Sequence, residues 1–551
     1  MRGITLRART VRFRPVGCRT GLLWLAVSVS LGLPAAMGFT DVVSAADSPA
    51  APAAPAPQTY WVQPDSAAVM PAYSRYDNSS GAVGVVLAHG PLRLSGHPFF
   101  SALGTNGRAC VTCHQPSSAM GLSVEAIRRR WRETSGKDPL FAAIDGSNCP
   151  NLPQQEESSH SLLLQRGLFR VSLPWPRSVG PDGTPVEPEF SIEVLRDPTG
   201  CNTDPVYGLK SASPHISVYR RPRMVANLKY VAIDAGGEVY GPAGPFNAKR
   251  LAMVMDRDPR SGRYVAMNTM SDARAPTLAM QAQEAARDHL QAQSPLSDAQ
   301  LTQLVAFESQ VFAAQDQDTV GDDFAQPATP PALGPRNLEI SRTGVLGDNF
   351  GNPAFKTFDV WKNPAATPAT TPAQAAFHAS VMRGYEVFFN RPFWIKDSTH
   401  INTAGLGNPA KRTCVTCHNL QMVGTDASAG WGDLGTNNEP WADEALFSPA
   451  YSTAPQLPLF KVVCRPDARP HPFLGRVIYT HDPGRALISG KCYDVGSVVM
   501  GQLRGLAARA PYFANGSAQD LRAVVDFYDR RFNMGLSELE REDLVNFLSV
   551  L

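Results

Sequence analysis

Four stretches of the chain carry apolar residues at spacings of three and four, the pattern of a helix with one buried face. They are residues 124–131, 275–291, 298–315 and 375–389. Two more helices are predicted near the C-terminus: Ser517 is expected to cap a helix that ends at Phe532, and Ser537 with Glu540 forms a capping box before an apolar stripe. These segments predict a fold that is mainly α.

Residues from about 145 to 260 show a different pattern. Short runs rich in β-branched and aromatic residues, such as FRVSLPWP, FSIEVLRD and ISVYRR, alternate with turn-forming residues. We therefore predict a β-rich insertion here. Three proline-rich stretches, APAAPAPQ, QPATPPALGPR and NPAATPATTPAQ, predict extended tethers or surface loops.

Composition narrows the class of protein. A chain of 551 residues is too long for one small domain and predicts two or more domains. Hydrophobic residues make up 43% of the chain and charged residues 18%, with a formal net charge of +2. This balance favours globular folding over disorder, and no basic face indicates nucleic-acid binding.

The N-terminus resembles a secretory signal peptide. Six arginines and no acidic residue occur in the first twenty positions, an apolar run follows from Gly21 to Leu33, and a small-residue cleavage site ends at Ala45. A membrane anchor is the alternative, but the run is shorter than the roughly 20 residues of a spanning helix. We predict a signal peptide at 1–45 and no membrane span in the mature chain.

The cysteines fall into three groups. Of the nine, Cys18 lies in the signal peptide, four lie in the repeated word CVTCH, and Cys149, Cys201, Cys464 and Cys492 remain. An even remainder in an oxidising compartment predicts disulfides. Proximity in the sequence favours Cys149 with Cys201 and Cys464 with Cys492, although three pairings are possible and buried thiols are the alternative.

The word CVTCH, at residues 110–114 and 414–418, is the strongest chemical signal. Two thiols three positions apart reach both vinyl groups of one haem from a single turn, and the next histidine ligates the iron. A thioredoxin-like pair does not need this histidine, and zinc needs further ligands nearby. We predict two covalent c-type haems. Their thioether residues are Cys110, Cys113, Cys414 and Cys417, and their proximal ligands are His114 and His418.

A weak internal repeat accompanies the word, because both copies follow an aromatic pair and a Gly/Asn loop. The repeat predicts two cytochrome c-like modules. The expected order is the signal peptide at 1–45, a Pro/Ala-rich segment at 46–87, a first module at 88–316 with the β-rich insertion, a linker at 317–374 and a second module at 375–551.

Three further segments carry a resemblance to a known family: DPGRALISGK, LRGLAARAPYF and PYFANGSAQDLRAVVDFYDRRF. With the two CxxCH words, the chain resembles the bacterial dihaem cytochrome c peroxidase and MauG superfamily over nearly its whole mature length. The resemblance implies a periplasmic protein in which one haem accepts electrons and the other meets hydrogen peroxide or another oxidant. The implied electron donor is a small cytochrome c or a cupredoxin.

The chain departs from this family at two places. A WDGR-like segment of the relatives stands here as SDAR, with Ser271 in the Trp position and Ala273 in the Gly position, while Asp272 and Arg274 match. Relatives also often carry a histidine where this chain has Ala514. A ligand or a buried polar group of the relatives is therefore expected to be missing.

Residues beyond the haem words are assigned through the resemblance. His289 is the candidate acid–base residue at the first haem, with a solvated helix histidine as the alternative. Met500 or Met534 is the candidate distal ligand of the second haem, with core packing as the alternative. Asn227 is the nearest match to a calcium ligand, with a turn-forming role as the alternative.

Two classes of function follow. The first is a peroxidase-like oxidoreductase that passes electrons between two haems to reduce hydrogen peroxide or a related oxidant. The second is a non-catalytic dihaem electron-transfer protein. A MauG-like or rubber-oxygenase-like oxidase with another substrate is a further alternative, because the insertion is long. We favour the peroxidase-like enzyme, although the changes in SDAR favour the alternatives.

Overall fold

The fold mixes helices and strands, so the prediction of a mainly α chain is wrong. The computed structural model describes residues 60–181, 183–228, 269–275, 277–326, 329–340, 358–362, 371–399, 407–418, 424, 431–439 and 454–551. Of these residues, 31% lie in helices and 19% in strands, and the strands form several small antiparallel sheets. The strands are two to seven residues long, and several pair with partners far away in the sequence, so those outside the insertion were not predicted.

Most predicted helices are present. They are α1 (Val124–Thr134), α4 (Leu278–Asp288), α5 (Asp298–Gln310), α7 (Pro372–Asn390), α10 (Leu521–Phe532) and α11 (Glu538–Ser549). The predicted capping box of α11 is confirmed, because Ser537 accepts a hydrogen bond from the Glu540 N–H and the Glu540 side chain reaches back to Ser537.

Two predicted helix boundaries are wrong. The helix expected over 298–315 stops at Gln310, and β8 (Val311–Gln317) follows because Val311 and Phe312 suit a strand and pair with β3 (Gly81–Leu87). At α10, Asp520 is the N-cap in place of Ser517, since its carboxylate accepts from the Ala523 N–H.

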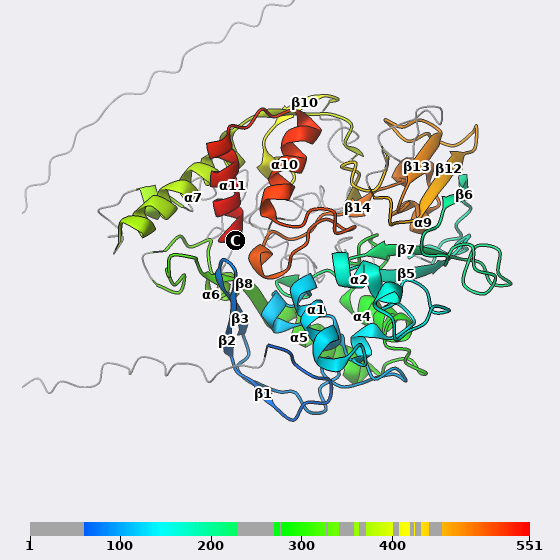
Figure 1. Ribbon diagram of the computed structural model, residues 1–551, viewed down its shortest axis with the longest axis horizontal. Helices are drawn as coiled ribbons and strands as arrows, with labels where there is room; N and C mark the ends of the chain where they lie inside the picture. Colours follow the sequence, from blue (N-terminus) through cyan, green and yellow to red (C-terminus); the bar gives the residue numbers. More distant parts are fainter. Residues whose placement is uncertain are drawn as a thin grey trace, which may run out of the picture. The chain divides into compact units, whose positions relative to one another are not determined.

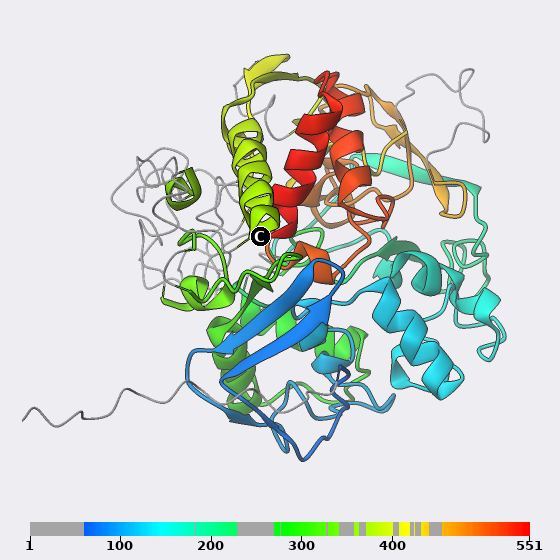
Figure 2. The ribbon, with the colours of Figure 1, turned by 60° about the vertical axis from the view of Figure 1, so that its left-hand side comes forward.

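A three-stranded antiparallel sheet is built from β2 (Tyr73–Asn78), β3 and β8. Figure 2 shows the blue hairpin β2–β3 beside the green strand β8. The Leu551 carbonyl, at the end of the chain, accepts from the Gln315 N–H at 3.2 Å. The sheet thus ties the N-terminal hairpin to the C-terminus.

The strands predicted in the insertion are present. β5 (Phe169–Pro174) pairs with β7 (His215–Arg220), and β6 (Phe190–Arg196) pairs with β12 (Leu459–Cys464), which also pairs with β13 (Val477–Thr480). Figure 1 shows β6 next to the orange strands β12 and β13. The insertion is therefore joined to the C-terminal part of the chain by a shared sheet; its residues 229–260 lie outside the described residues.

The helices α7, α10 and α11 lie side by side in both ribbon views (Figures 1 and 2). Their core contains Tyr385, Phe388 and Phe547, all buried, together with Val415 of the second haem word. A separate core packs Phe99, Phe100 and other residues around Val111 of the first word. Residues Pro55–Leu551 form one compact unit, and the division into two modules stays a prediction.

The remaining described elements are short. They are α2 (Ser161–Arg166), α6 (Pro335–Ile340), α9 (Ala486–Ser489), β1 (Val69–Met70), β4 (Leu92–Arg93), β9 (Phe393–Ile395), β10 (Ala410–Arg412), β11 (Trp431–Gly432) and β14 (Val498–Val499), with several 3₁₀ turns.

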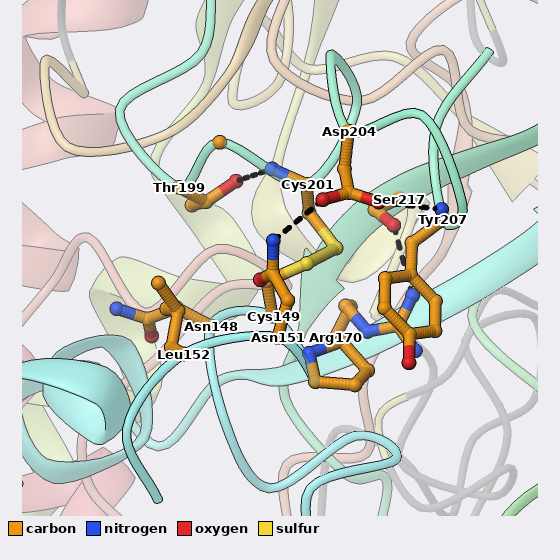
Figure 3. The surroundings of a disulfide bond; sticks show 12 residues. Asn148, Cys149, Asn151, Leu152, Arg170, Thr199, Cys201, Asp204, Tyr207 and Ser217 are labelled. Carbon is orange, nitrogen blue, oxygen red and sulfur yellow. Dashed lines mark hydrogen bonds between the residues drawn. A yellow bond between two sulfur atoms is a disulfide. The ribbon is translucent and has the colours of Figure 1, made fainter. Parts of the chain in front are cut away.

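Both predicted disulfides, Cys149–Cys201 and Cys464–Cys492, are present. Figure 3 shows Cys149–Cys201 below a hydrogen bond from the Asn151 side chain to Asp204, and Arg170 close by donates to Ser217. Two disulfides are compatible with an extracytoplasmic protein. The predicted signal peptide lies outside the described residues.

No helix in the described part of the chain combines the length and the apolar character that crossing a bilayer requires.

We expect the loss of the Cys149–Cys201 bond to destabilise the protein. Replacing both cysteines by Ser should lower the free energy of unfolding by about 2–4 kcal/mol, because the closed loop spans 52 positions and restricts the unfolded chain. Chemical denaturation of the double variant measures this loss. The Cys464→Ser/Cys492→Ser variant closes a loop of 28 and should lose slightly less; equal stability of parent and variants would contradict the prediction.

Two candidate haem-binding cavities

The two CVTCH words have the same local structure. Each begins with a 3₁₀ turn, Cys110–Thr112 or Cys414–Thr416, after an extended residue with φ −118° in both copies. The four thiols of the words lie outside the two disulfides. The repeat seen in the sequence is therefore also a repeat of backbone conformation.

The histidine of each word is oriented by a backbone carbonyl six positions further on. Nδ1 of His114 lies 3.3 Å from the Met120 oxygen, and Nδ1 of His418 lies 3.0 Å from the Gly424 oxygen. A ring that donates through Nδ1 presents Nε2 as the coordinating nitrogen, as is usual for metal-bound histidines.

The protonation states of the CVTCH residues favour metal binding by the histidine over redox chemistry of the thiols. Burial lowers the pKa of His114 to about 4, so the ring is neutral at physiological pH and able to coordinate a metal. Burial raises the pKa of Cys113 and of Cys414 to about 12. Redox-active thioredoxin-like pairs need a lowered thiol pKa, so these thiols do not fit that alternative.

The aromatic pair that precedes each word packs in the same way in both copies. The ring of Phe99 lies 6.4 Å from that of His114, and the ring of Phe388 lies 6.3 Å from that of His418, measured between centroids. The interplanar angles are 47° and 42°. Both histidines thus have an equivalent aromatic wall.

Each word opens into its own cavity. The space open to the centres of water molecules is about 170 Å³ beside Cys110, Cys113 and His114, the first cavity, and about 250 Å³ beside Cys414, Cys417 and His418, the second cavity. One water needs roughly 15 Å³ on this measure, so both cavities have room for a much larger group.

His289 lies in the wall of the first cavity, at the C-terminal end of α4. Its Nδ1 donates to Asp145 Oδ2 at 2.6 Å, and Arg108, fully buried, pairs with the other carboxylate oxygen. Burial alone would raise the pKa of Asp145, but Arg108 and the bond from His289 outweigh it and hold the pKa below its ordinary value. The ionised Asp145 fixes the ring and leaves Nε2 as a proton acceptor.

Glu308 is a second titratable group in the first cavity, and the sequence did not reveal it. It lies on α5 with only 3% of its surface exposed, and its Oε2 has no hydrogen-bond partner among the described residues. Burial raises the pKa of Glu308 to about 8, so the carboxyl group is mostly protonated at neutral pH.

The second cavity is lined mainly by apolar side chains. Both candidate ligands, Met500 and Met534, lie in its wall, so the structure does not choose between them. Tyr528 places its hydroxyl 3.5 Å from Nε2 of His418, and burial raises the pKa of this tyrosine above its usual range. Ala514 also lines this cavity.

The two cavities share a wall. It consists of residues 221–224, Ser271 and Gln502, which line both. Ser271, the first residue of the SDAR segment, therefore lies between the two candidate haem sites. Ala273 of the same segment has φ +54°, a left-handed conformation that glycine adopts more easily.

A buried ion network supports this wall. Arg220 contacts Asp272 at 2.5 Å and Asp482 at 2.6 Å, and Arg274 contacts Asp272 at 2.9 Å. Burial would raise the pKa of Asp272, but the two arginines hold it well below its usual range. Asp272 and Arg274 of the SDAR segment are thus both part of the network.

Asn227 and an acidic cluster bear on metal binding outside the cavities. Asn227 has φ +63°, and its side-chain amide donates to the carbonyl of Ala313 in β8 and accepts from the Ala313 N–H, a long-range structural contact; the calcium assignment stays a prediction. Within the described ranges, one group could hold a metal ion, namely Asp318, Asp322 and His378, whose ligand atoms lie within 4.8 Å of one another.

The residues fit two covalently attached haems. Each cavity offers two thiols and one oriented histidine, and the acidic metal group described above includes neither CVTCH word, so zinc is not supported there. No protein-family model matches the chain, and a search of curated proteins finds no match.

The raised pKa of Glu308 predicts a pH-dependent stability. The folded state holds this proton up to about pH 8, whereas the unfolded carboxyl releases it near pH 4.3. Glu308 therefore contributes favourably to the free energy of unfolding below about pH 4, and this contribution is lost as the pH rises towards 8. Between pH 5 and 8, the free energy of unfolding of the Glu308→Gln variant should fall by on the order of 2 kcal/mol less than that of the parent.

Urea denaturation of the haem-loaded protein at several pH values measures this difference. Glu157→Gln, at an exposed position, is the matched control and should follow the parent. Parallel curves for Glu308→Gln and the parent would contradict the raised pKa.

Proposed function

We propose that the protein is a periplasmic, peroxidase-like oxidoreductase that carries two covalent haems. The observation that carries the proposal is the difference between two cavities built on identical words. The first contains the acid–base groups His289 and Glu308, and the second contains the thioethers of Met500 and Met534. Acid–base groups suit reaction with an oxidant, whereas a thioether ligand suits electron transfer.

Reduction of hydrogen peroxide consumes two electrons and two protons and yields two molecules of water. A bound haem supplies the iron that binds the oxidant and the redox equivalents, while the chain supplies positioning and proton transfer. His289 accepts the proton of the incoming peroxide at Nε2, because its Nδ1–H is held by Asp145. It then returns this proton to the departing oxygen.

Electrons are proposed to enter at the second site and to cross the shared wall. Ser271 and Gln502 contact both cavities, so the distance between the sites is bridged by a single layer of protein. The donor in this proposal is a small cytochrome c or a cupredoxin. The two disulfides are compatible with the proposed periplasmic location.

Optical and electron paramagnetic resonance spectra of the oxidised and half-reduced protein test the proposal. We expect covalent haem at two sites, one high-spin haem that reacts with peroxide and one low-spin haem that does not. His114→Ala should remove the reactive signal, and His418→Ala should remove the other. Two unreactive low-spin haems would instead identify a non-catalytic electron carrier.

Replacing His289 tests the proposed proton transfer. His289→Ala should slow the reaction with peroxide by about 10²–10⁴-fold, because the proton acceptor is lost, while haem content stays the same. Stopped-flow mixing of the reduced protein with peroxide measures the rate. His89→Ala, at an exposed position, is the control. An unchanged rate in His289→Ala would remove His289 from the mechanism.

A further inference from the structure

Three arginines around the shared wall lack a counter-charge. Arg221 and Arg223 line both cavities, and Arg509 lines the second cavity. Each is half-buried. Among the described carboxylates, none lies within ion-pair distance of any of the three.

Backbone carbonyls hold these side chains in place. The acceptors are the carbonyls of Leu122, Arg166 and Arg509 for Arg221, those of Val499 and Met500 for Arg223, and those of Gln502 and Arg504 for Arg509. The two bonds of Arg223 are both 2.8 Å long. Neutral acceptors orient a guanidinium group, but they do not cancel its charge.

The pKa values of the three arginines are consistent with the lack of a carboxylate partner among the described residues. Burial, followed by the charge of Arg509, lowers the pKa of Arg221 to about 9 and that of Arg223 to about 10. Burial also lowers the pKa of Arg509 to about 10. The adjacent Arg220 shows the contrast: burial would lower its pKa, but Asp482 and Asp272 raise it above the usual range.

Leaving three cations unpaired in a buried wall is costly, so the wall is suited to an anionic ligand. Each haem carries two propionate carboxylates on one edge, and guanidinium groups bind carboxylates with charge-assisted hydrogen bonds. We propose that Arg221 and Arg223 bind propionates of both haems and that Arg509 binds a propionate of the second haem. This inference rests on the proposed occupancy of both cavities by haem.

Arginines that bind the propionates should change the reduction potential of each haem. A positive charge beside a haem favours the reduced state, whose net charge is more negative, and so raises the reduction potential. Removing a charge that faces both cavities should lower both potentials. Removing a charge that faces only the second cavity should lower one.

A redox titration of the full haem-loaded protein, followed by electron paramagnetic resonance so that each haem is observed separately, tests this. Arg223→Gln should shift both midpoint potentials downward, and Arg509→Gln should shift only that of the haem attached at Cys414 and Cys417. Arg223→Lys, which keeps the charge, should restore most of the potential. Arg132→Gln, an exposed change on α1, is the control and should shift neither.

The outcomes separate this inference from the proposed function. Absence of covalent haem in the parent protein would overturn both. Haem present at both sites, with potentials unchanged in Arg223→Gln or shifted at both haems in Arg509→Gln, would overturn the arginine assignment alone.

A measurement on the unmodified protein covers the case in which a variant fails to fold. The propionate bending bands in its resonance Raman spectrum should lie at the higher frequency of strongly hydrogen-bonded carboxylates. Bands at the position of solvated propionates would overturn the proposal.

Discussion

The contact of Arg220 with Asp272 and Asp482 is the interaction on which the arrangement of the cavities depends. The three residues come from the end of β7, from the SDAR segment and from the loop before α9, and each is almost fully buried. A buried charge is stable only with its partners in place, so this network fixes where the three segments meet. That meeting point is the wall between the two cavities, because residues 221–224 and Ser271 follow or precede the network directly.

The two CVTCH words are identical in sequence, but the residues that line their cavities differ. The 3₁₀ turns, the carbonyl that orients each histidine and the aromatic wall are shared by both copies. The differences come from residues far away in the sequence, namely His289 and Glu308 on one side and Met500 and Met534 on the other. Under the proposed function, the shared parts would serve attachment of a haem, and the parts that differ would set its reactivity.

The sequence revealed features that depend on near neighbours and missed those that depend on distant ones. The disulfides, the capping box at Ser537 and the position of α4 with His289 were predictable, since spacing and composition carry them. Strand β8 was read as a helix because its partner β3 lies more than two hundred residues earlier in the chain. Neither Glu308 nor the arginines of YRRPR were assigned a role from the sequence, because only the packing around them shows their burial.

The pairing of β6 with β12 has a consequence for assembly of the protein. Synthesis of a chain begins at its N-terminus, and β6 belongs to the earlier part of the chain, whereas β12 is made near the end. The edge of β6 therefore stays unpaired until most of the chain has been made, and such long-range pairing forms slowly. The sheet that joins β6 to β12 and β13 is thus expected to be among the last parts of the structure to form.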